Sequence, residues 1–142
     1  MYIDLTYIQA RVKQEDLISY TRDIGEAEVI NTTRIDALIN DACAEFDNAA
    51  SQGGYVVPIA TPTEYIKRIV FDIFLYYLTA RKQDDKEMKD VYVRYNSAYK
   101  KLKEIAGGQL KLAGISKTNS IYPVMTDKLI TDRIFTETNL NY

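Results

Sequence analysis

Apolar residues recur at helical spacing in two long stretches of the chain, residues 33–51 and 84–106. In the first stretch they are Ile35, Leu38, Ile39, Ala42, Phe46 and Ala49. In the second they are Met88, Val91, Tyr92, Tyr95, Tyr99, Leu102 and Ile105. Each set falls on one face at 3.6 residues per turn, while polar residues occupy the other side. The pattern therefore predicts two amphipathic helices, each burying one face.

The stretch between them, residues 61–82, is apolar around nearly its whole circumference. A helix of this kind is usually buried on all sides, so we expect it to be the central one. Its polar exceptions are spaced four residues apart: Glu64, Arg68 and Asp72. Opposite charges at this spacing favour a narrow stripe of ion pairs along the helix.

The predicted helices over residues 33–51 and 61–82 both carry sequence signals for a helix N-terminus. Thr33 with Asp36 resembles a capping pair at the beginning of residues 33–51. Thr61 is placed as the N-cap of the central helix, with Pro62 in its first position and Glu64 three residues after the cap.

The remaining segments are less regular. Residues 4–23 fit one or two short helices, and residues 24–30 break the pattern as a linker. Gly53 and Gly54 end the first amphipathic helix, and no helical period is sustained after Gly108. The sequence thus predicts an all-α fold, a small helical bundle with a central buried helix over residues 1–108 and an extended C-terminal arm over residues 109–142.

The loop after the glycine pair and the arm carry apolar residues that the helical faces do not need. They are Tyr55, Val56, Val57 and Ile59 in the loop, and Ile121, Tyr122, Ile134 and Phe135 in the arm. We expect these residues to form intermolecular contacts, with the first three exposed, because extended segments readily pair with a partner. The alternative is an arm folded back on its own helices.

The composition argues against a catalytic or metal-binding site. The chain has no histidine and a single cysteine, Cys43, which removes the commonest general base and the usual ligands of a zinc site. The pair Gly53-Gly54 lacks the lysine pattern of a phosphate-binding loop. We therefore expect no enzyme activity, no cofactor and no metal, and we interpret Cys43 as a packing residue.

Charge is unevenly distributed along the chain. Residues 1–60 hold ten acidic and four basic residues, net −6, whereas residues 61–142 hold ten acidic and fourteen basic residues, net +4. Two interpretations stay open: scatter over solvated faces, or head-to-tail packing in which one subunit's acidic side meets the next one's basic side. The overall charge of −2 gives no electrostatic reason to expect nucleic-acid binding. A tyrosine stripe, Tyr92, Tyr95 and Tyr99, is interpreted as core rather than as a base-stacking platform.

Several packing motifs occur in a fixed order. They are Ile35-Asp36-x-x-Ile39-x-x-Ala42-x-x-Phe46-Asp47, the loop Gly54-Tyr55-Val56-Val57-Pro58-Ile59, the helix end Leu75-Tyr76-Tyr77-Leu78, and the late Arg133-Ile134-Phe135-Thr136. In this order the chain resembles the Mu-like neck proteins of tailed bacteriophages, a family of head–tail connectors or head-completion adaptors. Their loop often reads Arg-Tyr-x-x-Pro, whereas Gly54 precedes Tyr55 here.

The resemblance implies a structural virion protein that joins head to tail. It implies a homo-oligomeric ring, a dodecamer in the virion, whose partners are the portal protein and a tail-proximal neck or tail protein. DNA would pass through the ring without sequence-specific binding. The expected location is the virion neck after assembly in the bacterial cytoplasm, without membrane contact. The alternative is a small helical nucleic-acid-binding or regulatory protein of a prophage.

Overall fold

The computed structural model describes residues 1–81 and 88–117. Within these ranges it contains five helices: α1 (Leu5–Gln9), α2 (Gln14–Thr21), α3 (Thr32–Gln52), α4 (Glu64–Ala80) and α5 (Met88–Ala106). The described residues form no β-strand, only an isolated antiparallel bridge between Tyr55 and Lys117. The predicted all-α bundle is confirmed.

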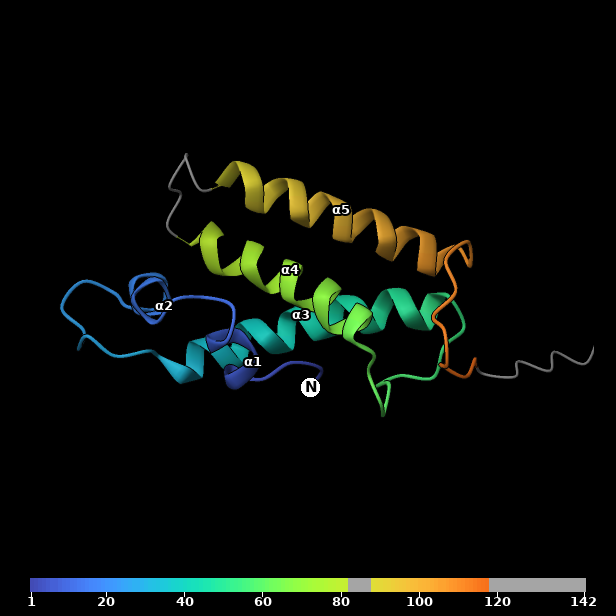
Figure 1. Ribbon diagram of the computed structural model, residues 1–142, viewed down its shortest axis with the longest axis horizontal. Helices are drawn as coiled ribbons and strands as arrows, with labels where there is room; N and C mark the ends of the chain where they lie inside the picture. The colour runs from blue at the N-terminus through green and yellow to red at the C-terminus, as the bar shows by residue number, and fades with distance from the viewer. Residues whose placement is uncertain (82–87, 118–142) are drawn as a thin grey trace, which may run out of the picture.

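The three long helices pack against one another and form the body of the molecule. Helix α4 contacts both α3 and α5, and α3 also contacts α5. As Figure 1 shows, α4 runs in the opposite direction to the other two, so the three helices form an up-down-up arrangement. The short helices complete the core, α1 against α3 and α2 against α4.

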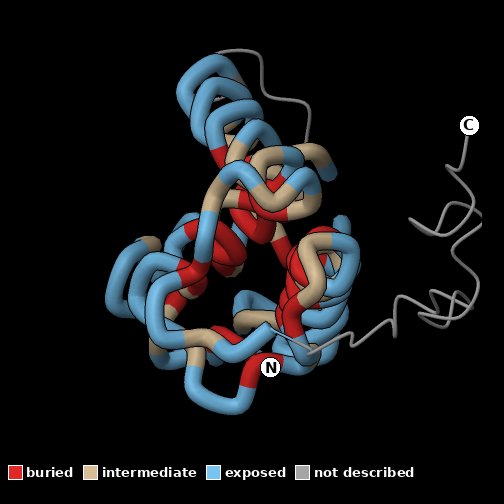
Figure 2. The backbone as a smooth tube through the Cα atoms, turned by 90° about the vertical axis from the view of Figure 1, so that its right-hand side faces the viewer, coloured by how far each residue is buried: buried red, intermediate tan, exposed pale blue. Residues whose placement is uncertain are grey.

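Helix α4 is the centre of the core, as its all-round apolar pattern predicted. Nine of its seventeen residues are buried. Those with essentially no exposed surface include Ile66, Ile69, Val70, Ile73, Phe74 and Leu78. Figure 2 shows the buried stretches of the helices turned toward the interior of the bundle. Burying one large apolar side chain stabilises the fold by about 1.5–3 kcal/mol, so this helix contributes a large part of the driving force.

The start of α3 differs from the predicted capping pair of Thr33 and Asp36. The N-cap is Asn31, whose side-chain oxygen accepts a hydrogen bond from the Arg34 N–H at 3.1 Å. Asparagine is among the best N-cap residues, and from its position the amide oxygen reaches the third helical N–H. Thr33 is therefore already inside the first turn.

The start of α4 also lies later than predicted, and the assignment of Thr61 as N-cap is wrong. The Thr63 hydroxyl accepts from the Ile66 N–H at 3.4 Å, and the helix begins at Glu64. Ile59 is buried in the core. The chain therefore uses residues 60–62 as a loop that returns from the core to the beginning of α4.

The two glycines that end α3 act differently. A Cβ atom on Gly53 would lie 2.3 Å from the carbonyl oxygen of Ile105, because the C-terminal ends of α3 and α5 meet there. Gly54 instead has φ +82°, a backbone conformation that favours glycine. The first glycine permits close helix packing, and the second turns the chain into the loop.

Candidate interaction surfaces of the loop, the arm and the helix faces

Tyr55, the first apolar residue of the loop, points into the molecule. Only 3% of its surface is exposed, contrary to the expectation that it faces solvent. Its hydroxyl accepts a hydrogen bond from the Leu112 N–H at 2.8 Å. The Lys117 ammonium lies 4.9 Å from the ring centroid, beside the backbone bridge between these two residues. Tyr55 therefore joins the loop to the beginning of the arm within one chain.

Ile59, at the other end of the loop, is also buried, and its N–H donates to the Tyr2 hydroxyl at 2.9 Å. The same hydroxyl donates to the Asp47 carboxylate on α3. Burial, together with Asp47, raises the pKa of Tyr2 above that of an ordinary tyrosine. The tyrosine thus ties the N-terminal segment, α3 and the loop together.

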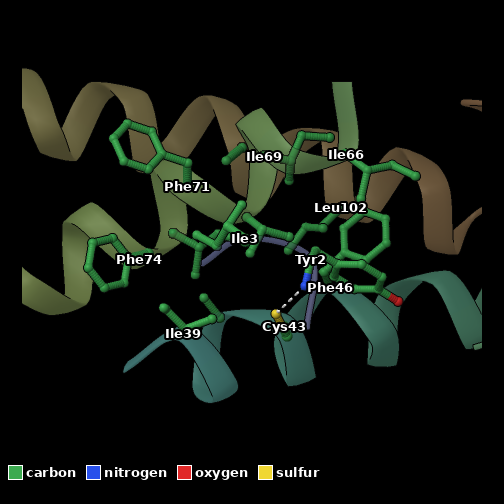
Figure 3. Packing of buried hydrophobic residues seen from close by; sticks show 14 of the residues in the cluster. Tyr2, Ile3, Ile39, Cys43, Phe46, Ile66, Ile69, Phe71, Phe74 and Leu102 are labelled. Atoms are coloured by element: carbon green, nitrogen blue, oxygen red, sulfur yellow. Dashed lines mark hydrogen bonds between the residues drawn. The ribbon is translucent and has the colours of Figure 1, made fainter. Parts of the chain in front are cut away.

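The sequence interpretation did not identify Tyr2 as a structural residue. A signal was available, since the apolar pair Tyr2-Ile3 directly precedes Asp4, the N-cap of α1. Tyr2 packs edge-to-face on Phe46 with ring centroids 5.4 Å apart. Figure 3 shows it beside Ile3 above α3.

Of the four predicted contact residues in the loop, Val56 is the one that is exposed. It is 56% exposed, whereas Val57 is partly buried against the core. Beside Val56 lies a shallow groove of about 280 Å³. Its lining comes from the loop and from the beginning of the arm: Val56, Pro58, Ile59, Ala60, Thr61, Gly114, Ile115 and Ser116. Loop and arm thus form one continuous surface at the end of the bundle.

The described part of the arm, residues 109–117, folds back on the chain. Leu112 is buried, and Leu110 and Ile115 pack partly against the core. For these residues the folded-back alternative holds. The other four predicted contact residues, Ile121, Tyr122, Ile134 and Phe135, lie outside the described residues, so their assignment stays a prediction.

The interpretation of the α5 tyrosine stripe as core holds only for Tyr95, which packs partly against the core, whereas Tyr92 and Tyr99 are exposed. Tyr95 stacks on Tyr76 with centroids 4.0 Å apart, and Tyr77 and Tyr95 both donate to the Glu45 carboxylate. Burial, reinforced by Glu45, raises the pKa of Tyr95 to about 12. Because one face of the Tyr95 ring is already stacked and a carboxylate lies beside it, Tyr95 is poorly suited to stacking on nucleic-acid bases.

The polar stripe of α4 does not pair within itself as its spacing predicted. Glu64 is bound by Lys67 at 2.8 Å, and Asp72 accepts two hydrogen bonds from Arg94 of α5, at 3.0 and 2.5 Å. Arg68 has neither a hydrogen-bond nor an ion-pair partner in the described part of the chain. Asp72, which the i,i+4 pattern paired with Arg68, is therefore paired with Arg94 of the neighbouring helix instead.

Cys43 is buried on α3, and the Tyr2 N–H donates to its sulfur at 3.4 Å (Figure 3). Burial raises the pKa of this thiol, which lowers its thiolate fraction. Among residues 1–81 and 88–117, no cluster of three His, Cys, Asp or Glu side chains is arranged to hold a metal ion. No helix in these ranges combines the length and apolar character needed to cross a bilayer.

Comparison with known proteins gives one family. The family model described as Bacteriophage Mu, Gp36, matches residues 2–122, most of the chain. A comparison with curated proteins finds no match. The match covers all five helices, the loop and the described part of the arm, and it agrees with the resemblance to Mu-like phage proteins. The chain therefore belongs to the Bacteriophage Mu Gp36 family.

Proposed function

We propose that this phage protein is a structural component of the virion neck, a head-completion adaptor that forms a ring at the portal and joins head to tail. The observation that carries the proposal is the family match over residues 2–122, which covers the described fold as a whole. In this role the chain binds proteins and has no catalytic function, cofactor or metal of its own.

The structure supports an adaptor role through the end of the bundle where loop and arm meet. Val56 is exposed there on a backbone held by buried Tyr55 and Ile59. An exposed apolar residue on a fixed backbone can enter a partner's pocket with little loss of conformational entropy. We assign this surface to contact with the portal or with a tail-proximal protein.

The remainder of the arm is proposed as the second contact. We assign its apolar residues Ile121, Tyr122, Ile134 and Phe135 to contact with a neighbouring subunit or a second neck protein. A connector must hold several proteins at once, and a body with a separate arm can provide more than one binding surface.

The test is deletion of the gene from its phage or prophage, followed by electron microscopy of the particles. We expect DNA-filled heads and free tails, with joining restored by supplying the intact chain in trans. Mass spectrometry of purified particles should detect the protein at several copies per virion. Normal tailed particles without the protein would contradict the proposal and favour a regulatory role.

A further inference from the structure

A groove of about 400 Å³ lies between α4 and α5 on the outside of the bundle. Its lining combines three arginines with two acids and one aromatic residue: Arg11, Arg68, Arg94, Glu64, Asp72 and Phe71. The arginines come from three parts of the chain: the turn after α1, helix α4 and helix α5. The fold therefore brings together guanidinium groups that are far apart in sequence.

The charges of the groove are only partly balanced. Asp72 forms a salt bridge with Arg94, and Glu64 forms one with Lys67. Arg11 donates to the Tyr7 carbonyl at 3.0 Å and lies 3.5 Å from the centroid of the Tyr7 ring. The pKa of Glu64 is lowered mainly by Lys67 and also by the charge of Arg11, so Arg11 already has a nearby carboxylate. The exposed Arg68 side chain has no such partner within the described ranges, and its guanidinium is thus available to a carboxylate from outside.

The outer face of α3 has the opposite character. The helix carries four acids, Asp36, Asp41, Glu45 and Asp47, against one arginine, a net charge of −3. Tyrosine hydroxyls already bind Glu45 and Asp47. In the described part of the chain, the exposed side chains of Asp36 and Asp41 make no hydrogen bond or ion pair. The exposed positions between and beside them are small: Ala37, Asn40 and Ala44. A face of this kind allows another surface to approach closely.

The two surfaces lie on different sides of the bundle. Helix α3 packs against both α4 and α5, so its exposed residues point away from both helices. The arginine groove lies between α4 and α5, and none of its lining residues belongs to α3. A contact between the two surfaces must therefore join different molecules, and it repeats in one direction, as a ring requires.

We propose that the arginine groove of one copy receives the acidic outer face of α3 of a second copy, with Arg68 opposite Asp41. This inference rests on the proposed ring and names its subunit contact. We favour a second copy over DNA, because the chain's net charge of −2 gives no electrostatic reason to expect binding to a polyanion. The same chain also supplies a complementary face with two unpaired carboxylates.

The experiment is a charge-swap cycle on the full chain, with self-association measured by sedimentation velocity at several protein concentrations and two salt concentrations. Arg68→Glu and Asp41→Arg should each weaken association by about tenfold or more, because like charges then oppose each other. The double variant should restore most of the loss, since unlike charges again meet at every contact. Added salt should weaken the wild-type chain.

Lys111→Glu and Asp16→Arg are matched controls, because they make the same changes in charge at exposed positions outside both surfaces. They should associate like the wild type. Asp41→Arg and Lys111→Glu should retain the wild-type melting temperature. Arg68→Glu places an acid four residues from both Glu64 and Asp72, and Asp16→Arg replaces an acid in the first turn of α2, so each should lower the melting temperature slightly without unfolding the chain.

Three results would overturn the inference: a wild-type chain that stays monomeric, single variants that associate normally, or a double variant no better than the singles. If Arg68→Glu lowers DNA affinity but leaves self-association unchanged, the groove is a phosphate site and the inference is also wrong. Particle analysis separates this result from the proposed function. If the protein is found in the neck but its self-association is unaffected by the charge swap, the proposed function stands and this contact is wrong. If self-association responds to the swap but the protein is absent from particles, the contact stands and the proposed function is wrong.

Discussion

The core around α4 and the loop–arm end of the bundle are both rich in apolar residues, but they are stabilised in different ways. In α4 the apolar residues cover most of the helix circumference, and α3 and α5 pack against it, so Phe74 and Ile73 are fully buried. In the loop, Tyr55 is buried and the next residue, Val56, is exposed. The positions of Tyr55 and Ile59 in the loop are instead fixed by single hydrogen bonds, from the Leu112 N–H to the Tyr55 hydroxyl and from the Ile59 N–H to the Tyr2 hydroxyl.

The difference concerns how many contacts hold each region in place, and therefore how much a single substitution should affect it. Many side chains share the packing of the core, whereas the loop depends on a few contacts between residues about 57 positions apart in sequence. The predictions below separate the two regions, beginning with the largest expected effect.

Phe74→Ala should have the largest effect, because Phe74 is fully buried in α4 and packs against Phe71 with ring centroids 6.3 Å apart. Truncating a buried phenylalanine costs about 3–5 kcal/mol in the free energy of unfolding. Chemical denaturation followed by circular dichroism measures it. Val93→Ala, at a position 66% exposed on α5, is the control and should be nearly neutral. Equal midpoints for the two variants would show that α4 is not the centre of the core.

Two truncations test whether the beginning of the arm belongs to the body. Ending the chain after Gly108 removes buried Leu112 and leaves the Tyr55 hydroxyl without its partner. We expect a loss of about 2–4 kcal/mol in the free energy of unfolding. Ending the chain after Lys117 retains these contacts and should give a more stable protein than ending it after Gly108. If both truncated chains melt like the full chain, the loop–arm contacts contribute nothing to stability.

Gly53→Ala tests the close approach of α3 and α5. The added Cβ would lie 2.3 Å from a backbone oxygen, so the helix ends must separate. Overpacking of this kind costs about 1–3 kcal/mol. Ser51→Ala, at an exposed position two residues earlier in the same helix, is the control and should melt like the wild type. A wild-type melting temperature for Gly53→Ala would show that the two helix ends are loosely packed.

High pH should destabilise the tyrosine cluster. The pKa of Tyr95 is raised to about 12 by burial and by Glu45, against about 10 for an unfolded tyrosine. The stabilisation is therefore complete below pH of about 10 and is lost as pH rises toward about 12, because the unfolded chain releases the phenolic proton first. The slope of stability against pH in this window should be smaller in Tyr95→Phe. An unchanged slope would assign the alkaline transition to other groups.

The sequence could predict the long helices, the central position of α4 and the break at the glycine pair, because helical periodicity and glycine conformation are local properties. It could not predict that Asn31 and Thr63 are the caps, since neighbouring residues compete for the same N–H groups within one turn. Nor could it separate Tyr55 from Val56, because the hydrogen-bond partner of buried Tyr55 is Leu112, which lies 57 positions later in the sequence. The assignment of Arg68 failed for the same reason, since Arg94 of another helix binds Asp72.

Val56→Asp should have the smallest effect on stability and a clear effect on assembly. Val56 is 56% exposed and makes no buried contact that the fold needs, so the melting temperature should stay at the wild-type value. A charge placed in an apolar contact must lose its water on binding, which opposes joining of the chain to portal-bearing heads. The measurement is the fraction of tailed particles after complementation of a deletion strain. Val93→Asp makes the same substitution at a position 66% exposed on α5, outside the loop–arm surface, and reports whether added charge alone is responsible. If Val56→Asp supports normal tail joining, the loop is not part of the interface, and the contact must lie in the arm or on the helix faces.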